Sequence, residues 1–296
     1  MKVLVTGTRG QLVRSLIERR AGWPEIDVAA VGRAEADLEA PGSVARAIAA
    51  HRPDAVVNAA AFTAVDLAED EPDRTLRINR DAAGEAAAAA RSIGAPIIQL
   101  STDYVFDGEQ AGAYDETALT APLGVYGHSK LAGEERVRSA QPDHLILRTA
   151  WVYSPFGRNF VKSTISAAAD RDTLSVVDDQ RGSPTSALDL ADAIFHVLDE
   201  WRRRSRTGLG QTYHLVGSGE TSWFGFAEVI MRLCSALGLP HAAVVPITTA
   251  DWPTRARRPH NSVLDSSKFA RDFGVRLPDW RGSLDTVVRR LAGDAP

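Results

Sequence analysis

The chain has 296 residues, of which 44% are hydrophobic and 24% are charged, so its composition is that of a globular protein and excludes a disordered one. A formal net charge of −4 offers no basic surface, and we expect neither nucleic acid nor a membrane as a partner. The single cysteine, Cys234, cannot form an internal disulfide, and the first 20 residues hold no long apolar run. We therefore expect a cytoplasmic protein.

The first half of the chain alternates short apolar runs with helical patterns. Strands are predicted at 2–6, 26–31, 55–58, 96–100 and 144–149. Helices are predicted at 11–20, 41–51, 79–93 and 126–140. This alternation predicts an α/β fold with a doubly wound parallel sheet of the Rossmann type.

The rhythm changes after about residue 151. Helices are predicted at 159–169, 186–201, 222–237 and 282–291, joined by short strands such as 174–177 and 212–216. We expect residues 1–150 to form a dinucleotide-binding domain. Residues 151–296 should form mainly a smaller C-terminal substrate-binding lobe, with some segments returning to the first domain.

A glycine-containing turn, TGTRGQLV at 6–13, follows the first predicted strand and opens the first predicted helix. Gly7 and Gly10 permit a tight turn and a close approach of the backbone to a phosphate, and the helix N-terminus favours an anion. The alternative is an ordinary strand-to-helix turn. Val13 takes the place of the third glycine of such loops, where it should push the helix outward or shift the cofactor slightly.

The end of the second predicted strand lacks the carboxylate that a dinucleotide enzyme uses to bond the ribose of NAD. Gly32 and Arg33 stand there instead. The guanidinium of Arg33 can pair with a 2′-phosphate, which predicts NADPH over NADH, although a plain surface arginine is the alternative. Asp37 and Leu38 follow and are expected near the adenine.

Tyr126 and Lys130 are four residues apart and share one face of a predicted helix. An ammonium in this position can lower the pKa of the phenol and make tyrosine a usable acid. The apolar strand 96–100 runs into Ser101 and Thr102, at the sheet edge where ligands bind. Either hydroxyl can bond a substrate oxygen beside Tyr126. A surface pair on the helix and a turn cap at the strand end are the alternatives.

Other kinds of chemistry find no support in the sequence. The seven histidines show no zinc-ligand spacing, so we expect no catalytic metal. Neither G-x-S-x-G nor H-E-x-x-H is present, which argues against hydrolases of those types. Cys234 lies in an apolar helical pattern and is expected in the core.

Several tracts together resemble a known family: GTRGQL at 7–12, STDYVFDG at 101–108, YGHSKLAGE at 126–134 and RPHNSVLD at 258–265. The chain resembles the extended short-chain dehydrogenases/reductases, and among them the dTDP-4-dehydrorhamnose reductases. The resemblance implies reduction of the C4 keto group of dTDP-4-dehydro-L-rhamnose with NADPH, NADH being a second option. Related dehydratases carry Asp–Glu after the threonine, whereas here Asp103 is followed by Tyr104.

The resemblance also implies roles for individual residues. Tyr126 would donate the proton to the C4 oxygen, Lys130 would lower its pKa and hold the nicotinamide ribose, and Thr102 would bond the C4 oxygen. The residues that match cofactor-binding positions are Gly7, Gly10, Gln11, Leu12, Ala59, Ala60 and Ala61. Those that match positions on the sugar or nucleotide side are Thr63, Val65, Thr102, Asp103, Trp151, Asn159, Arg258 and Asn261.

Two other functions stay open at this stage. One is a non-catalytic NADP-binding regulatory subunit, and the other is a reductase or epimerase of another nucleotide sugar. Some members of the family form a metal-bridged dimer through glutamates at positions where this chain has Ser15 and Leu188. We therefore expect a monomer or a weak homodimer.

Overall fold

The computed structural model describes residues 1–293 and is built around one six-stranded parallel sheet, in the order β10-β5-β4-β3-β1-β2. Its strands are β1 (Lys2–Thr6), β2 (Asp27–Val31), β3 (Ala55–Asn58), β4 (Ile97–Thr102), β5 (His144–Thr149) and β10 (Gln211–His214). From β1 the chain passes to β2 on one side and then to β3 on the other. The predicted doubly wound sheet is confirmed, and its order reverses beside β1, where such sheets bind ligands.

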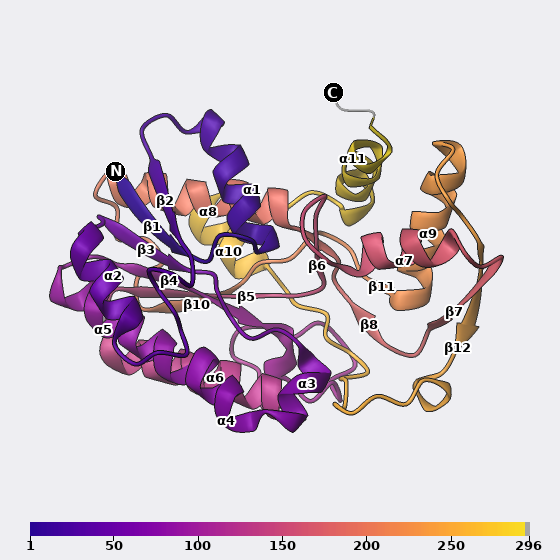
Figure 1. The fold of residues 1–296 in the computed structure, drawn as a ribbon, viewed down its shortest axis with the longest axis horizontal. Coiled ribbons are helices and arrows are strands. Elements are labelled where there is room, and N and C mark those ends of the chain that lie inside the picture. Colours follow the sequence, from indigo (N-terminus) through magenta and orange to yellow (C-terminus); the bar gives the residue numbers. More distant parts are fainter. Residues whose placement is uncertain (294–296) are drawn as a thin grey trace.

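Helices cover both faces of this sheet (Figure 1). One face carries α2 (Ser43–His51), α3 (Val65–Asp70), α4 (Pro72–Leu76), α5 (Ala82–Ser92) and α6 (Val125–Ala140). The other face carries α1 (Gln11–Arg19), α8 (Ala187–Arg202) and α10 (Ser267–Phe273). The helix expected at 79–93 starts earlier, because a π-helical turn, η2 (Arg77–Asp81), continues directly into α5.

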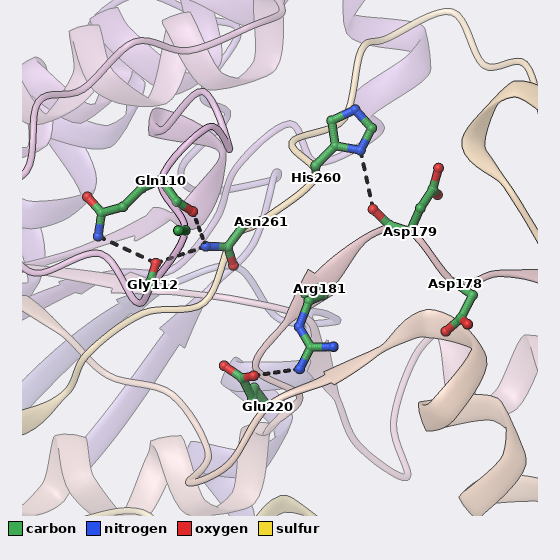
Figure 2. Close-up of a pocket in the computed structure, with 9 residues that line it drawn as sticks. Gln110, Gly112, Asp178, Asp179, Arg181, Glu220, His260 and Asn261 are labelled. Atoms are coloured by element: carbon green, nitrogen blue, oxygen red, sulfur yellow. Dashed lines mark hydrogen bonds and ion pairs between the residues drawn. The ribbon is translucent and has the colours of Figure 1, made fainter.

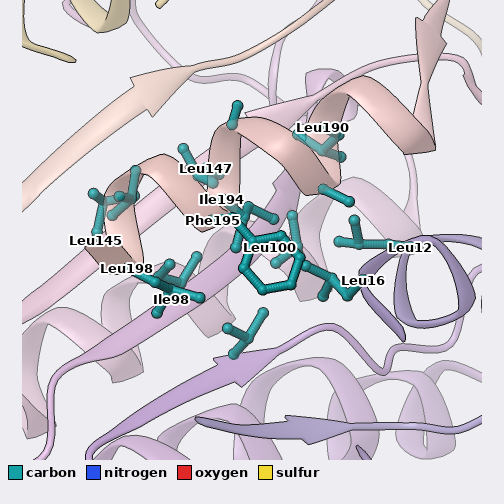
Figure 3. Close-up of a cluster of buried hydrophobic side chains, with 14 of the residues drawn as sticks. Leu12, Leu16, Ile98, Leu100, Leu145, Leu147, Leu190, Ile194, Phe195 and Leu198 are labelled. Atoms are coloured by element: carbon teal, nitrogen blue, oxygen red, sulfur yellow. The ribbon is translucent and has the colours of Figure 1, made fainter. Parts of the chain in front are cut away.

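The strands are apolar on both sides because helices bury both sides. Figure 3 shows the core beneath α1 and α8, where Leu16 and Phe195 meet Ile98 of β4. The neighbouring Ile97 faces the opposite core, under α2 and α5, as the two-residue period of a strand requires. Burying each such side chain contributes about 1.5–3 kcal/mol.

The C-terminal part of the chain forms a second group of elements beside the sheet (Figure 1). It contains the helices α7 (Phe160–Ala168), α9 (Trp223–Ala236) and α11 (Trp280–Ala292) and a parallel pair, β7 (Thr173–Val177) with β12 (Ala243–Ile247). Tyr153, Phe226 and Trp280 are fully buried in its core.

Short elements connect these parts. The two-residue strands pair as β6 (Val152–Tyr153) with β9 (Thr185–Ser186) and β8 (Arg181–Gly182) with β11 (Thr221–Ser222). Single 3₁₀ turns form η1 (Arg20–Gly22), η3 (Asp103–Val105) and η4 (Thr249–Asp251). Among residues 1–293, no helix combines the length and the hydrophobicity needed to cross a bilayer.

Two segments of the second half return to the sheet. The strand expected at 212–216 is β10, which pairs in parallel with β5 and forms the sixth strand of the main sheet. Helix α8 packs against α1. The sequence pattern shows that these elements exist, but it does not show which neighbour each one takes.

Candidate active site

Thr102 and Tyr126 come together where β4 ends and α6 begins. Thr102 is the last residue of β4, and Tyr126 lies in the first turn of α6. Gly127 allows this approach, because a Cβ there would overlap the backbone carbonyl of Tyr104. The ring of Tyr126 stands edge-on to that of Tyr104, with 5.6 Å between centroids.

Burial governs the acidity of Tyr126. A hydrogen bond with the Thr102 side chain lowers the pKa of the phenol, but desolvation is the larger effect and raises the pKa to about 12. The structure thus differs from the expectation that Lys130 lowers this pKa. The reason is geometric: the ammonium of Lys130 donates to the backbone carbonyl of Leu100 at 2.6 Å.

The Lys130 side chain is itself almost fully buried, and desolvation lowers its pKa to about 8. Glu134, one turn further along α6, opposes this shift through its negative charge. Glu134 is held by Arg148 of β5 at 2.8 and 2.9 Å and by the Ser101 hydroxyl at 2.6 Å. Of the two hydroxyls considered for the substrate, Ser101 is bonded to Glu134, whereas Thr102 is the one that contacts Tyr126.

Asp103 is buried directly after the strand. Desolvation raises the pKa of its carboxyl to about 6, although hydrogen bonds with Ser262 and Thr102 offset part of the effect. The Thr102 hydroxyl donates to Asp103 Oδ1 at 2.9 Å. The predicted substrate contact Asp103 therefore shares one hydrogen-bonded group with the predicted catalytic threonine.

The turn between β1 and α1 fits the pyrophosphate of a dinucleotide. Gly7 has a φ of +97°, a conformation that favours glycine. Gly10 precedes α1 in an extended conformation, and no side chain caps the helix. The first N–H groups of α1, at Gln11 and Leu12, therefore lack a capping side chain and can bind an anion.

Val13 is accommodated in the core. It is 2% exposed and packs in the cluster beneath α1. A Cβ at Gly7 would lie 3.4 Å from Val13 Cγ2 and 3.5 Å from the Cβ of Ala60. A glycine and a small alanine thus lie on the side of the turn where the valine points.

Arg33 lies after β2 among carboxylates. Its guanidinium donates to Glu39 at 3.2 Å and lies 3.9 Å from Asp37, and its side chain is 73% exposed. Arg74 of α4 bonds the same Glu39 at 2.8 Å. Arg74 cannot be linked to this site by sequence spacing, because it is 41 residues away from Arg33. Leu38 packs against the core under α2 and α5.

Two predicted substrate residues belong to the second group of elements. The indole of Trp151 stacks on that of Trp223 at 3.5 Å, and Trp151 has a φ of +46°. Asn159 caps α7, and its amide donates to Gln11 Oε1 at 3.0 Å. Asn159 therefore ties α7 to the first residue of α1.

The structure does not gather every predicted substrate residue in one place. The Arg258 guanidinium donates to Asp66 of α3 at 2.8 Å, while Thr63 is exposed ahead of that helix, which starts at Val65. The side-chain amide of Asn261 donates hydrogen bonds to the backbone carbonyls of Gln110 and Gly112. Asn261 also lines a separate pocket of about 280 Å³, together with Arg181, Glu220 and His260 (Figure 2). Neither Thr102 nor Tyr126 lines that pocket.

No cluster that could hold a metal ion occurs in residues 1–293, judged by groups of three or more His, Cys, Asp or Glu side chains. Cys234 is buried in α9, and burial raises the pKa of its thiol to about 11.

Sequence and structure comparisons both find dTDP-4-dehydrorhamnose reductases among the proteins similar to this chain. The profile of the family described as RmlD substrate binding domain matches residues 1–292. A dTDP-4-dehydrorhamnose reductase of Sinorhizobium fredii is 43% identical over 291 residues, which cover 98% of either chain. The crystal structure of such a reductase from Clostridium acetobutylicum is 37% identical, with a TM-score of 0.89 over 98% of this chain and 99% of that one. The enzyme from Bacillus anthracis, in complex with NADP, has the same TM-score at 34% identity and covers the same shares.

Proposed function

The chain belongs to the family described as RmlD substrate binding domain, and from this we propose that it is an NADPH-dependent oxidoreductase. It reduces the C4 keto group of dTDP-4-dehydro-L-rhamnose and forms dTDP-L-rhamnose, as the names of its relatives indicate. One observation carries the proposal at the site: the hydroxyl of Thr102 is bonded to Tyr126, one helical turn before Lys130.

Thr102 and Tyr126 are suited to protonating a ketone oxygen. The raised pKa of Tyr126 keeps the phenol protonated at neutral pH, as a proton donor must be. Bound NADPH supplies the hydride. Tyr126 donates its proton to the C4 oxygen, and Thr102 bonds the same oxygen. Where the resemblance places the eliminating glutamate of the dehydratases this chain has Tyr104, so it lacks that carboxylate.

The ends of the strands hold the cofactor in this proposal. The N-terminus of α1 with Gly7 and Gly10 faces the pyrophosphate, and Arg33 pairs with the 2′-phosphate. Lys130 holds the nicotinamide ribose. Ala59, Ala60 and Ala61 lie along the cofactor, Gln11 and Leu12 complete the loop, and Asp37 and Leu38 lie near the adenine.

The substrate is placed between the two halves of the chain. Residues 1–150 bind the dinucleotide, and most of 151–296 binds the nucleotide sugar through Trp151, Asn159, Arg258 and Asn261, together with Thr63, Val65 and Asp103. We place the protein in the cytoplasm, as a monomer or weak homodimer without nucleic-acid partners. The unpaired thiol of Cys234 supports a reducing compartment.

The test is to incubate the protein with NADPH and dTDP-4-dehydro-L-rhamnose while following the absorbance of the reduced nicotinamide. We expect NADPH to disappear in a one-to-one ratio with the sugar nucleotide. Tight NADPH binding without oxidation would favour the regulatory subunit instead. Oxidation with a different 4-keto sugar nucleotide, and none with this one, would contradict the proposed substrate.

A further inference from the structure

A row of buried polar side chains crosses the sheet below the candidate site. Thr6 ends β1, Asn58 ends β3, and Gln99 lies within β4. None of the three is more than 3% exposed. Polar groups in an otherwise apolar sheet are costly unless they are hydrogen-bonded, so each of the three needs a hydrogen-bond partner inside the fold. The proposed reaction assigns no role to Asn58 or Gln99.

Backbone groups fix the direction of this row at its first member. The hydroxyl oxygen of Thr6 accepts from the backbone N–H groups of Ala59 and Ala60 at 3.1 and 3.0 Å. Its single proton is therefore free for Asn58 Oδ1, which accepts it at 2.7 Å. The orientation of the Asn58 amide follows from this, because its oxygen must face the threonine.

The same logic orients Gln99. Asn58 Nδ2 donates to Gln99 Oε1 at 2.8 Å, so the NH₂ group of Gln99 points the other way, to the carbonyl of Leu100 at 2.9 Å. That carbonyl also accepts from Lys130 Nζ at 2.6 Å. One carbonyl thus takes a neutral and a cationic side-chain donor, and the row ends at the lysine.

We propose that Gln99 is a positioning residue for Lys130: its amide, oriented through Asn58 and Thr6, shares the Leu100 carbonyl with the ammonium and so limits how strongly that carbonyl binds the lysine. The row starts directly before Gly7 and bonds the backbone of Ala59 and Ala60, so it joins the cofactor loop to the lysine. Its catalytic meaning rests on the proposed function, in which Lys130 holds the nicotinamide ribose.

The charge balance around the ammonium gives this arrangement a measurable consequence. The positive end of the Gln99 amide dipole is directed at the oxygen that the ammonium uses, so it disfavours the charged lysine. Burial acts in the same direction, whereas Glu134 on α6, paired with Arg148 of β5, opposes both. Removing the Gln99 amide should therefore raise the pKa of Lys130 above its present value of about 8.

The substitution Gln99→Met keeps the length of the side chain and removes both amide contacts. Gln141→Met is the matched control, because Gln141 is also buried and its amide also donates to a carbonyl, that of Ala95, at 2.7 Å. The chain has four lysines, so proteins with ¹³C-labelled lysine Cε give a spectrum in which Lys130 is followed directly by NMR as the pH is raised. This titration does not depend on any enzymatic activity.

We expect the Lys130 midpoint to rise by about half a pH unit or more in Gln99→Met and to stay at the wild-type value in Gln141→Met. An unchanged midpoint in Gln99→Met overturns the proposal. If that variant does not fold, Gln99→Leu also removes the amide donor without adding a charge, and the same rise is required of it. A wild-type protein without reductase activity would refute the proposed function. The titration would still show whether Gln99 affects the pKa of Lys130, because it needs no enzymatic activity.

Discussion

At the scale of single residues, the proposed reaction depends on the Tyr126 hydroxyl. The phenol is bonded to Thr102 and stays protonated because burial raises its pKa to about 12. We expect Tyr126→Phe to lower kcat by roughly 10²-fold or more, the usual effect of losing a general acid, while NADPH binding stays nearly intact. Turnover measured at saturating NADPH, with cofactor affinity from fluorescence, checks this.

The matched control is Tyr213→Phe, which also removes a phenolic hydroxyl. Tyr213 is buried in β10 and donates to Asp272 of α10 at 2.6 Å, on the edge strand of the sheet. Its loss should leave kcat near the wild-type value. Wild-type turnover in Tyr126→Phe would remove the residue from the mechanism.

Arg33 carries the choice of cofactor. Its guanidinium is exposed, and a surface ion pair such as Arg33–Glu39 stabilises the fold by only about 0–1 kcal/mol. It can therefore exchange Glu39 for a 2′-phosphate. We expect Arg33→Ala to weaken NADPH binding and barely change NADH binding, as measured by titration with each cofactor. Equal losses for both would show that Arg33 has another role.

At the scale of elements, Val13 tests how α1 meets the sheet. The side chain is buried, so Val13→Gly should lower the free energy of unfolding by about 2–4 kcal/mol through lost packing and lost helix propensity. The same change removes the methyl groups beside Gly7, so we expect NADPH binding to tighten. Chemical denaturation and NADPH titration measure the two effects. If the variant binds NADPH no better, the valine causes no loss of affinity.

His214 at the end of β10 should make stability depend on pH. The ring is fully buried, and desolvation first, then the charge of Arg148, lowers its pKa to about 4. The unfolded chain titrates near 6.5, so the stabilisation is complete above that pH and is lost as the pH falls toward 4. Between pH 7 and pH 5 the loss is about 2 kcal/mol.

The variant His214→Gln removes this titration and keeps an N–H donor for the Tyr114 carbonyl, which the ring bonds at 3.0 Å. Its unfolding free energy should fall less between pH 7 and pH 5 than that of the wild type. The control is the same substitution at an exposed histidine: His241→Gln should keep the wild-type dependence of unfolding free energy on pH. Equal slopes for all three proteins would contradict the argument.

The elements themselves follow well from the sequence, but their partners do not. The predicted strands 2–6, 55–58 and 144–149 match β1, β3 and β5, because runs buried on both faces are mainly apolar. The row through Asn58 and Gln99 depends on strands that are 41 residues apart, and the bond between Arg258 and Asp66 spans 192 residues. No spacing rule identifies such pairs. Gln99, a polar residue inside an apolar strand, is the one local signal of its row.

At the scale of the whole molecule, the predicted catalytic and cofactor-binding residues lie at the carboxyl ends of parallel strands. The second group of elements lies beside the sheet (Figure 1). The motifs for Thr102, Tyr126 and Lys130 could be found in the sequence because they are local. The acidity of Tyr126 could not, since it depends on burial by the assembled fold rather than on the neighbouring lysine.

In the proposed reaction, hydride from NADPH reaches C4 of the sugar. The most direct test uses NADPH carrying deuterium at the transferable position of the nicotinamide, with dTDP-4-dehydro-L-rhamnose as substrate and the product analysed by NMR. We predict one deuterium at C4 of the rhamnosyl group in the wild-type product, and about one hundredth as much of this product or less from Tyr126→Phe in the same time. Consumption of NADPH without deuterium at C4, or deuterium at another carbon, would contradict the account.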